Sequence, residues 1–110
     1  EHIAKPNLPE VSMDDLLAAW DQVLLRAKNY THHRISREQL SVREHMTLIL
    51  RRLQQEGVVE FNHLFDPADG IPKMVTYFLA VLELAREGLI RITQQAGFAP
   101  IHLQAAELMA

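Results

Sequence analysis

The stretch IPKMVTYFLAVLELAREGLIRITQQAGFAPIHL, residues 71–103, decides the fold of this 110-residue chain. Its first half is rich in apolar residues and predicts a helix over residues 71–87. Pro72 falls in the first turn, where a helix accepts proline, and Gly88 follows the last turn as a terminator. The helix is therefore delimited at both ends by the sequence itself.

A β-hairpin is predicted directly after this helix. Ile90 and Ile92 alternate with polar residues, as in a half-buried strand. The polar residues 94–97 predict a turn, and residues 98–103 return as a second strand.

The residues before this stretch predict a helix and then a short strand. Ser41 and Glu44 form a capping box, and an apolar stripe follows them as far as Gly57, a residue type that ends helices. Residues 58–61 contain β-formers, and residues 62–65 predict a helical turn. This order of helix, short strand, short helix, longer helix and hairpin is the winged-helix arrangement, in which the hairpin is the wing.

The first 40 residues predict one further helix. Residues 5–9 read as extended because they contain two prolines. Ser12 and Asp15 then form a start similar to a capping box, and apolar residues recur at helical spacing over residues 13–30. The fold class is mainly α with a small β-hairpin, a winged-helix domain preceded by an additional helix. The expected parts are a linker (1–11), a helix and loop (12–40), the winged-helix domain (41–104) and a tail (105–110).

The composition is that of an ordinary globular domain, with 48% hydrophobic and 23% charged residues. The chain has no cysteine, and no apolar run approaches the ~18–20 residues that span a bilayer. We expect a cytoplasmic protein without a membrane-bound segment. The chain begins at Glu1 and not at methionine, so we also expect it to be a piece of a longer protein.

No catalytic, cofactor or metal site is predicted. His32 and His33 are adjacent, and no third ligand stands at helical spacing from them. A nucleophile-elbow sequence and a glycine-rich phosphate loop are both missing from the sequence. We therefore expect neither enzymatic activity nor a bound cofactor.

The charge is unevenly distributed, although the net charge is only −3. Residues 26–52 carry seven Lys or Arg against two Glu, whereas residues 53–110 carry three basic side chains against seven acidic ones. A DNA-binding winged helix inserts the second helix of its motif into the major groove, and here that helix is 71–87. Its charges sum to zero, so it is poorly equipped to bind phosphate. A DNA-binding transcriptional regulator is the alternative function, with residues 26–52 as its basic contact.

The helix 71–87 is apolar over a wider arc than one packed face needs. Two apolar stripes run side by side at 100° per residue. The first contains Met74, Tyr77, Val81 and Leu84, and the second contains Ile71, Val75, Phe78, Leu79 and Leu82. Together they cover about 220°, whereas one core-facing helix needs about 100°. Either the first helix, with Trp20, covers the second stripe, or a partner protein does.

Residues 76–88, 90–95 and 98–103 resemble the C-terminal signature of the segregation and condensation protein A family, the bacterial kleisins. Residues 41–46 are similar to the upstream helix of that family. The resemblance covers residues 41–103 well, and the helix 13–30 is similar in position and pattern to the end of the family's middle region, with a looser motif.

This resemblance implies a non-enzymatic adaptor in chromosome condensation and segregation. Kleisins of this family bridge a dimer of structural-maintenance-of-chromosomes (SMC) ATPases, and their C-terminal winged helix binds the ATPase head of one subunit. The partner-binding residues would then be Val75, Phe78, Leu79 and Leu82. Segregation and condensation protein B would bind through residues upstream of or within 1–40, the end of the kleisin middle region. Contact with DNA would be weak or indirect, and the protein would associate with the nucleoid.

Overall fold

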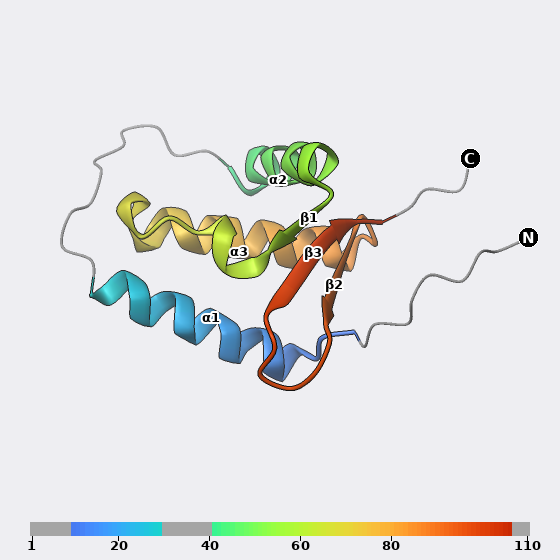
Figure 1. Ribbon diagram of the computed structural model, residues 1–110. Coiled ribbons are helices and arrows are strands. Elements are labelled where there is room, and N and C mark those ends of the chain that lie inside the picture. The colour runs from blue at the N-terminus through green and yellow to red at the C-terminus, as the bar shows by residue number, and fades with distance from the viewer. Residues whose placement is uncertain (1–9, 30–40, 107–110) are drawn as a thin grey trace, which may run out of the picture.

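The computed structural model describes residues 10–29 and 41–106 (Figure 1). The described elements are α1 (Met13–Lys28), α2 (Val42–Glu56), β1 (Val58–Glu60), the 3-10 turns η1 (Phe61–Leu64) and η2 (Pro67–Asp69), α3 (Ile71–Arg86), β2 (Ile90–Gln94) and β3 (Ile101–Ala105). The fold is mainly helical with a small sheet, as predicted. The order from α2 onward agrees with the predicted winged-helix arrangement.

The helices begin at the caps that the sequence predicts. The Ser12 hydroxyl accepts a hydrogen bond from the backbone N–H of Asp15 at 3.1 Å. At the start of α2, the Ser41 hydroxyl accepts from the Glu44 N–H at 3.1 Å, and the Glu44 carboxylate accepts from the Ser41 N–H at 2.8 Å. Gly57 ends α2 with a φ of 85°, a left-handed conformation that glycine adopts at little cost.

The three strands form an antiparallel sheet in the order β1-β3-β2. Leu103, at the centre of β3, pairs with Val59 on one side and Ile92 on the other, and it is fully buried. The backbone N–H of Val11 donates to the Ile92 carbonyl at 3.3 Å, so the chain just before α1 lies along the outer edge of β2.

The boundaries of two predicted strands were wrong. Phe61 belongs to η1 and not to the strand before it, and its side chain is buried in the core. The last strand begins at Ile101 and not at Phe98, because Pro100 has no N–H to donate to the sheet. It also extends through Ala105, which was predicted to lie in the tail.

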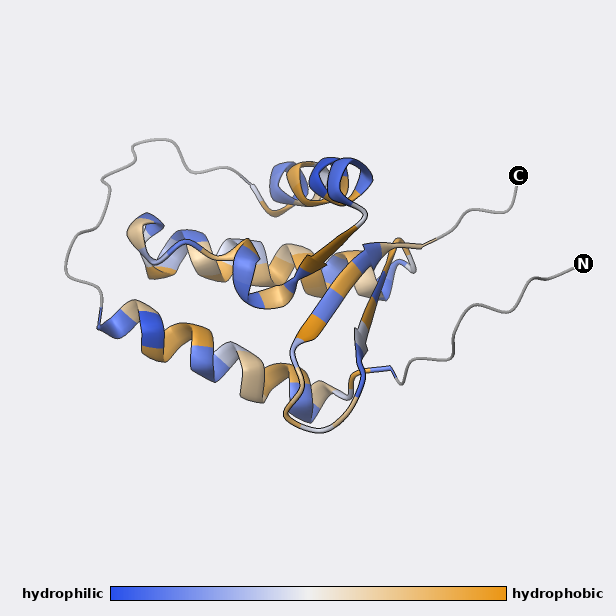
Figure 2. Ribbon diagram, in the orientation of Figure 1, coloured by the Kyte–Doolittle hydropathy of each residue, from blue (hydrophilic) through white to orange (hydrophobic). Residues whose placement is uncertain are grey.

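The core is built around α3, which lies between α1 and α2 (Figure 1). Hydrophobic residues occur along the whole length of α3 in Figure 2. The first helix joins the same core through four buried side chains, Leu16, Trp20, Val23 and Ala27. The Trp20 ring stacks on the Phe78 ring, with centroids 4.4 Å apart and an interplanar angle of 5°. Of the two explanations for the second apolar stripe, coverage by the first helix therefore holds at Phe78.

Candidate protein-binding surface

The second apolar stripe of α3 divides into a covered part and an exposed part. Phe78 is 6% exposed and belongs to the core, so it is not accessible to a partner while α1 is in place. Val75 is 37% exposed and Leu79 is 46% exposed. Leu82 is partly buried against the core. The structure therefore leaves three of the four predicted partner-binding residues at least partly accessible.

The exposed apolar surface continues from α3 onto α1. The two helices run in opposite directions (Figure 1) and are joined by the Trp20–Phe78 stack. Leu17 and Leu24 lie about one turn to either side of Trp20, as Val75 and Leu82 do around Phe78. Leu17 is 44% exposed and Leu24 is partly buried. We call this surface the α1–α3 face and define it by Leu17, Leu24, Val75, Leu79 and Leu82.

The cations of α3 are paired with carboxylates. Arg86 donates two hydrogen bonds to Glu83, and this interaction lowers the pKa of the Glu83 carboxyl. The Lys73 ammonium lies 3.9 Å from a carboxylate oxygen of Asp69. Because neighbouring carboxylates offset both charges, α3 offers little attraction to a phosphate backbone.

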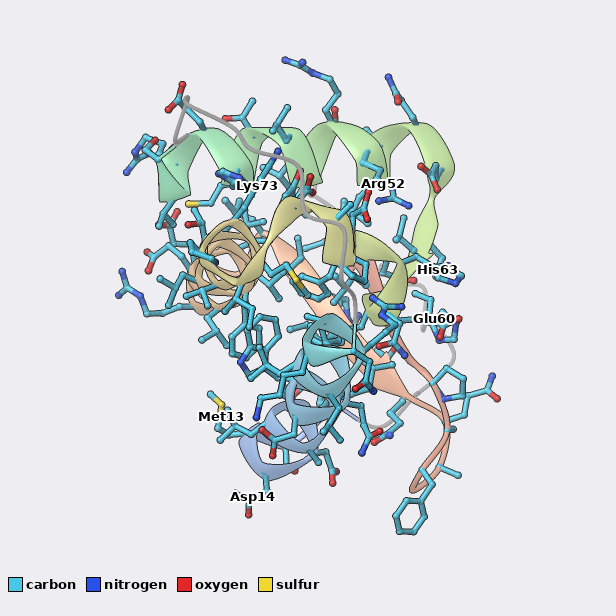
Figure 3. All side chains as sticks on the ribbon, turned by 90° about the vertical axis from the view of Figure 1, so that its left-hand side faces the viewer. Met13, Asp14, Arg52, Glu60, His63 and Lys73 are labelled. Atoms are coloured by element: carbon cyan, nitrogen blue, oxygen red, sulfur yellow. The ribbon has the colours of Figure 1, made fainter. Side chains whose placement is uncertain are left out.

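Two arginines of the predicted basic stretch hold η1 in place. Arg26 of α1 donates to the carbonyls of Phe65 at 2.8 Å and Asn62 at 3.2 Å. Arg52 of α2 donates to the His63 carbonyl at 3.1 Å and to the Glu56 carboxylate at 2.9 Å, and Figure 3 shows it above the segment that carries His63. These two side chains therefore stabilise the fold, and they are less available to bind the phosphates of DNA.

Metal ligands do not cluster in the part of the chain that the structure describes. Within residues 10–29 and 41–106, no group of three or more His, Cys, Asp or Glu side chains could hold a metal ion. His32 and His33 lie outside these residues. His45 is buried, its Nδ1 lies 2.9 Å from the Ser41 carbonyl, and its ring meets the Tyr77 ring edge to face. None of the helices in the described ranges is both long and apolar enough to cross a bilayer.

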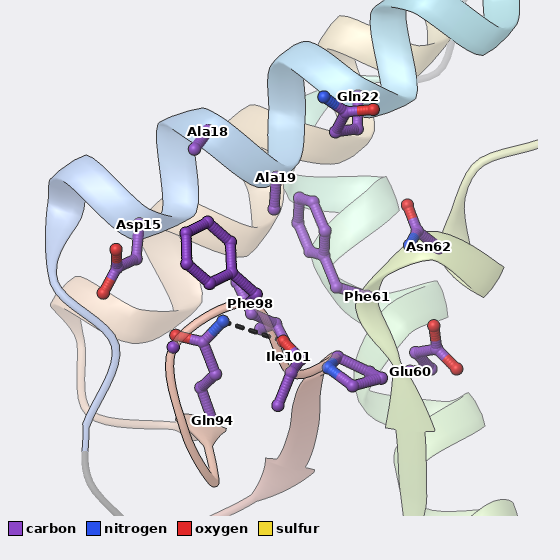
Figure 4. Close-up of a pocket in the computed structure, with 13 residues that line it drawn as sticks. Asp15, Ala18, Ala19, Gln22, Glu60, Phe61, Asn62, Gln94, Phe98 and Ile101 are labelled. Carbon is purple, nitrogen blue, oxygen red and sulfur yellow. Dashed lines mark hydrogen bonds between the residues drawn. The ribbon is translucent and has the colours of Figure 1, made fainter.

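The wing carries a surface feature that the sequence did not predict. Phe98 lies in the loop between β2 and β3, is fully exposed and has a φ of 67°. Next to it, a cavity of about 560 Å³ lies between α1 and the wing (Figure 4). Pro100 is the signal in the sequence that could have predicted a loop at Phe98, because proline has no N–H to donate to a sheet.

In the part of the chain that the structure describes, the α1–α3 face is apolar and the cations of α3 are paired with carboxylates. No cluster of metal ligands is present there. The sequence model of the family described as "Segregation and condensation protein ScpA" matches residues 5–106. The chain belongs to the segregation and condensation protein A family. The match includes α1 as well as the elements from α2 to β3.

Relatives within the segregation and condensation protein A family agree with this assignment. The protein of that name from Xylella fastidiosa (strain 9a5c) is 42% identical over 96 residues, which are 87% of this chain and 32% of the relative. That of Coxiella burnetii is 39% identical over 97 residues, which are 88% of this chain and 36% of the relative. That of Listeria innocua is 33% identical over 99 residues, which are 86% of this chain and 39% of the relative. The chain spans about a third of the length of these relatives.

Proposed function

We propose that this chain is the head-binding part of a kleisin, which acts in chromosome condensation and segregation by binding the ATPase head of an SMC protein. The name of the family supports the role in chromosome segregation and condensation. The observation that carries the proposal of a protein partner is the α1–α3 face. It presents apolar side chains to solvent from two adjacent helices, next to a core that is already filled.

Apolar surface of this kind favours a protein partner over DNA. A contiguous exposed apolar patch marks an interaction site because its burial against a partner is favourable, at roughly 25 cal/mol per Å². Leu79 and Val75 supply exposed apolar area on α3, and Leu17 supplies it on α1. The DNA-binding regulator is less well supported, since the cations of α3 are paired and Arg26 and Arg52 bind backbone carbonyls.

In this proposal the chain is an adaptor without enzymatic activity or a cofactor. It would act in the cytoplasm, at the nucleoid, where its SMC partner works. Segregation and condensation protein B would bind through residues upstream of or within 1–40. Of these, residues 1–9 and 30–40 lie outside the described residues. The proposed winged-helix unit, 41–104, shares its core with α1, so we further propose that residues 12–28 belong to the head-binding unit.

Co-purification with the isolated SMC ATPase head of the same organism tests the proposal. We expect the two proteins to elute together from a size-exclusion column as a stoichiometric complex. The SMC hinge domain serves as the control, and we expect it to elute separately. Separate elution of the head at micromolar concentrations of both proteins would contradict the proposal.

A further inference from the structure

A second surface of the domain lies on the opposite flank of α1 from the α1–α3 face. It is the cavity of about 560 Å³ between α1 and the wing, which we call the wing groove. On α1 it is lined by Asp15, Ala18, Ala19 and Gln22, whose spacing of three, four and seven residues places them on one face of the helix. The wing loop forms the facing wall, and Phe61 also lines the cavity (Figure 4). The small side chains of Ala18 and Ala19 keep the space between the helix and the wing open.

Phe98 lines this groove, and its side chain is not covered by any other part of the described chain. Its side chain is fully exposed, and its φ of 67° lies in the left-handed region that a bulky residue rarely adopts. Such strained residues persist where the surrounding structure holds them, and they concentrate at binding sites. Phe is one of the aromatic residues enriched at protein interfaces, and its ring buries a large apolar area when a partner covers it.

The wing loop is held in shape by its own hydrogen bonds. The Gln94 side chain donates to the Ala99 carbonyl at 2.8 Å, and the Ala99 N–H donates to the Ala96 carbonyl at 3.0 Å. A loop that is already ordered loses less conformational entropy when a partner binds. The groove is thus formed before any partner arrives.

The charged residues of the groove lining indicate the chemistry of the partner. Asp15 and Glu60 are the two charged residues of the lining, both are carboxylates, and they come from different elements (Figure 4). Carboxylates repel the phosphates of a nucleic acid and attract Lys or Arg. The apolar contacts of the lining come from Ala18, Ala19 and Pro100, because Phe61 and Ile101 are buried and offer a partner almost no surface. A guanidinium here could also lie over the Phe98 ring.

We propose that the wing groove binds a segment of a partner protein that presents an apolar side chain next to Lys or Arg, with Phe98 as its aromatic anchor. This surface is separate from the α1–α3 face, so the domain could contact two protein surfaces at once. The proposal does not depend on the identity of the partner at the α1–α3 face.

Selection from a random 12-residue peptide library displayed on phage, with the full 110-residue chain as bait, tests the proposal. We expect the selected peptides to combine apolar residues with Lys or Arg, and their synthetic versions to bind less tightly as salt is raised, because Asp15 is exposed and Glu60 is only partly buried. Phe98→Gly removes the ring and accepts the left-handed backbone, so this variant keeps the fold and its thermal midpoint. We expect it to bind the selected peptides at least about tenfold more weakly, as for the loss of an anchor residue.

Two charge variants and one control complete the design. Asp15→Asn and Glu60→Gln should each weaken binding and reduce its dependence on salt, whereas Leu79→Ala on the α1–α3 face should leave peptide binding unchanged. No enrichment over background, enrichment of acidic peptides, or binding unaffected by Phe98→Gly would overturn the proposal. A dimer of the free chain in sedimentation velocity that dissociates in Phe98→Gly would also overturn it, because the groove would then belong to a second copy. SMC-head binding that is lost in Phe98→Gly would overturn the independence of the two surfaces.

Discussion

The contact between Trp20 and Phe78 determines how much of α3 a partner can reach. Trp20 is 8% exposed, stacks on Phe78 and meets the Phe65 ring edge to face with centroids 5.2 Å apart. The sequence placed both residues on apolar stripes of their helices. It could not show that the two stripes meet, because helical periodicity specifies which face of a helix is apolar and not what covers it.

Trp20→Ala should therefore destabilise the whole domain and not α1 alone. Truncating a buried Trp leaves a cavity and typically costs about 3–5 kcal/mol of the free energy of unfolding. Urea denaturation followed by circular dichroism measures this loss. Leu25→Ala on the same helix is the matched control, since Leu25 is 52% exposed and its truncation should change stability by about 0.5 kcal/mol or less. Equal, small effects of both substitutions would show that α1 does not pack on the domain in solution.

At the scale of the elements, local signals predicted well and long-range ones did not. The N-caps Ser12 and Ser41, together with Gly57 and Pro72, act within a turn or two of the chain, and the helices they delimit lie where the sequence placed them. The start of β3 was misplaced because alternation at Phe98 resembles a strand, whereas the ladder depends on the partner strand and on the missing N–H of Pro100. The wing groove combines residues from α1, β1 and the wing, which no local pattern connects.

The capping box of α2 should give the domain a measurable dependence on pH. The hydrogen bond from the Ser41 N–H lowers the pKa of Glu44 below its usual 4.5. A carboxyl whose pKa is lower in the folded state contributes stability above its unfolded pKa, and this contribution disappears as the pH falls through the folded pKa. Glu44→Gln should thus be less stable than the wild type at pH 7, and the difference should shrink as the pH falls below about 4.5, which is the range of an unperturbed Glu.

Urea denaturation of both proteins between pH 7 and pH 3 measures this difference. Ser41→Ala is a useful companion, because loss of an N-cap side chain costs about 1 kcal/mol. A difference between wild type and Glu44→Gln that stays constant over this range would show that the carboxylate charge plays no part in the cap.

At the scale of the whole molecule, the distribution of charge predicts weak binding to DNA. Arg26 and Arg52 are committed to carbonyls of the η1 region, and the wing groove adds carboxylates beside the wing. Any affinity for duplex DNA should come from phosphate contacts alone and fall steeply with salt. In a mobility-shift assay we expect binding to be lost by about 200 mM salt. Tight, sequence-selective binding at that salt concentration would favour the DNA-binding regulator over the adaptor.

Titration of the SMC head with two charge variants tests whether the α1–α3 face binds it, as we propose. Leu79→Arg places a cation on the proposed face at a site that is 46% exposed, so the free domain keeps its fold and the charge stays in water. Leu48→Arg does the same on α2, where Leu48 is 37% exposed, and both variants should unfold at the wild-type temperature. Against the apolar surface of the partner, an unpaired guanidinium should cost about 3 kcal/mol or more, which raises the Kd more than about 100-fold. We expect this loss for Leu79→Arg and wild-type affinity for Leu48→Arg, measured by isothermal titration calorimetry. A folded Leu79→Arg variant with wild-type affinity would contradict the proposal.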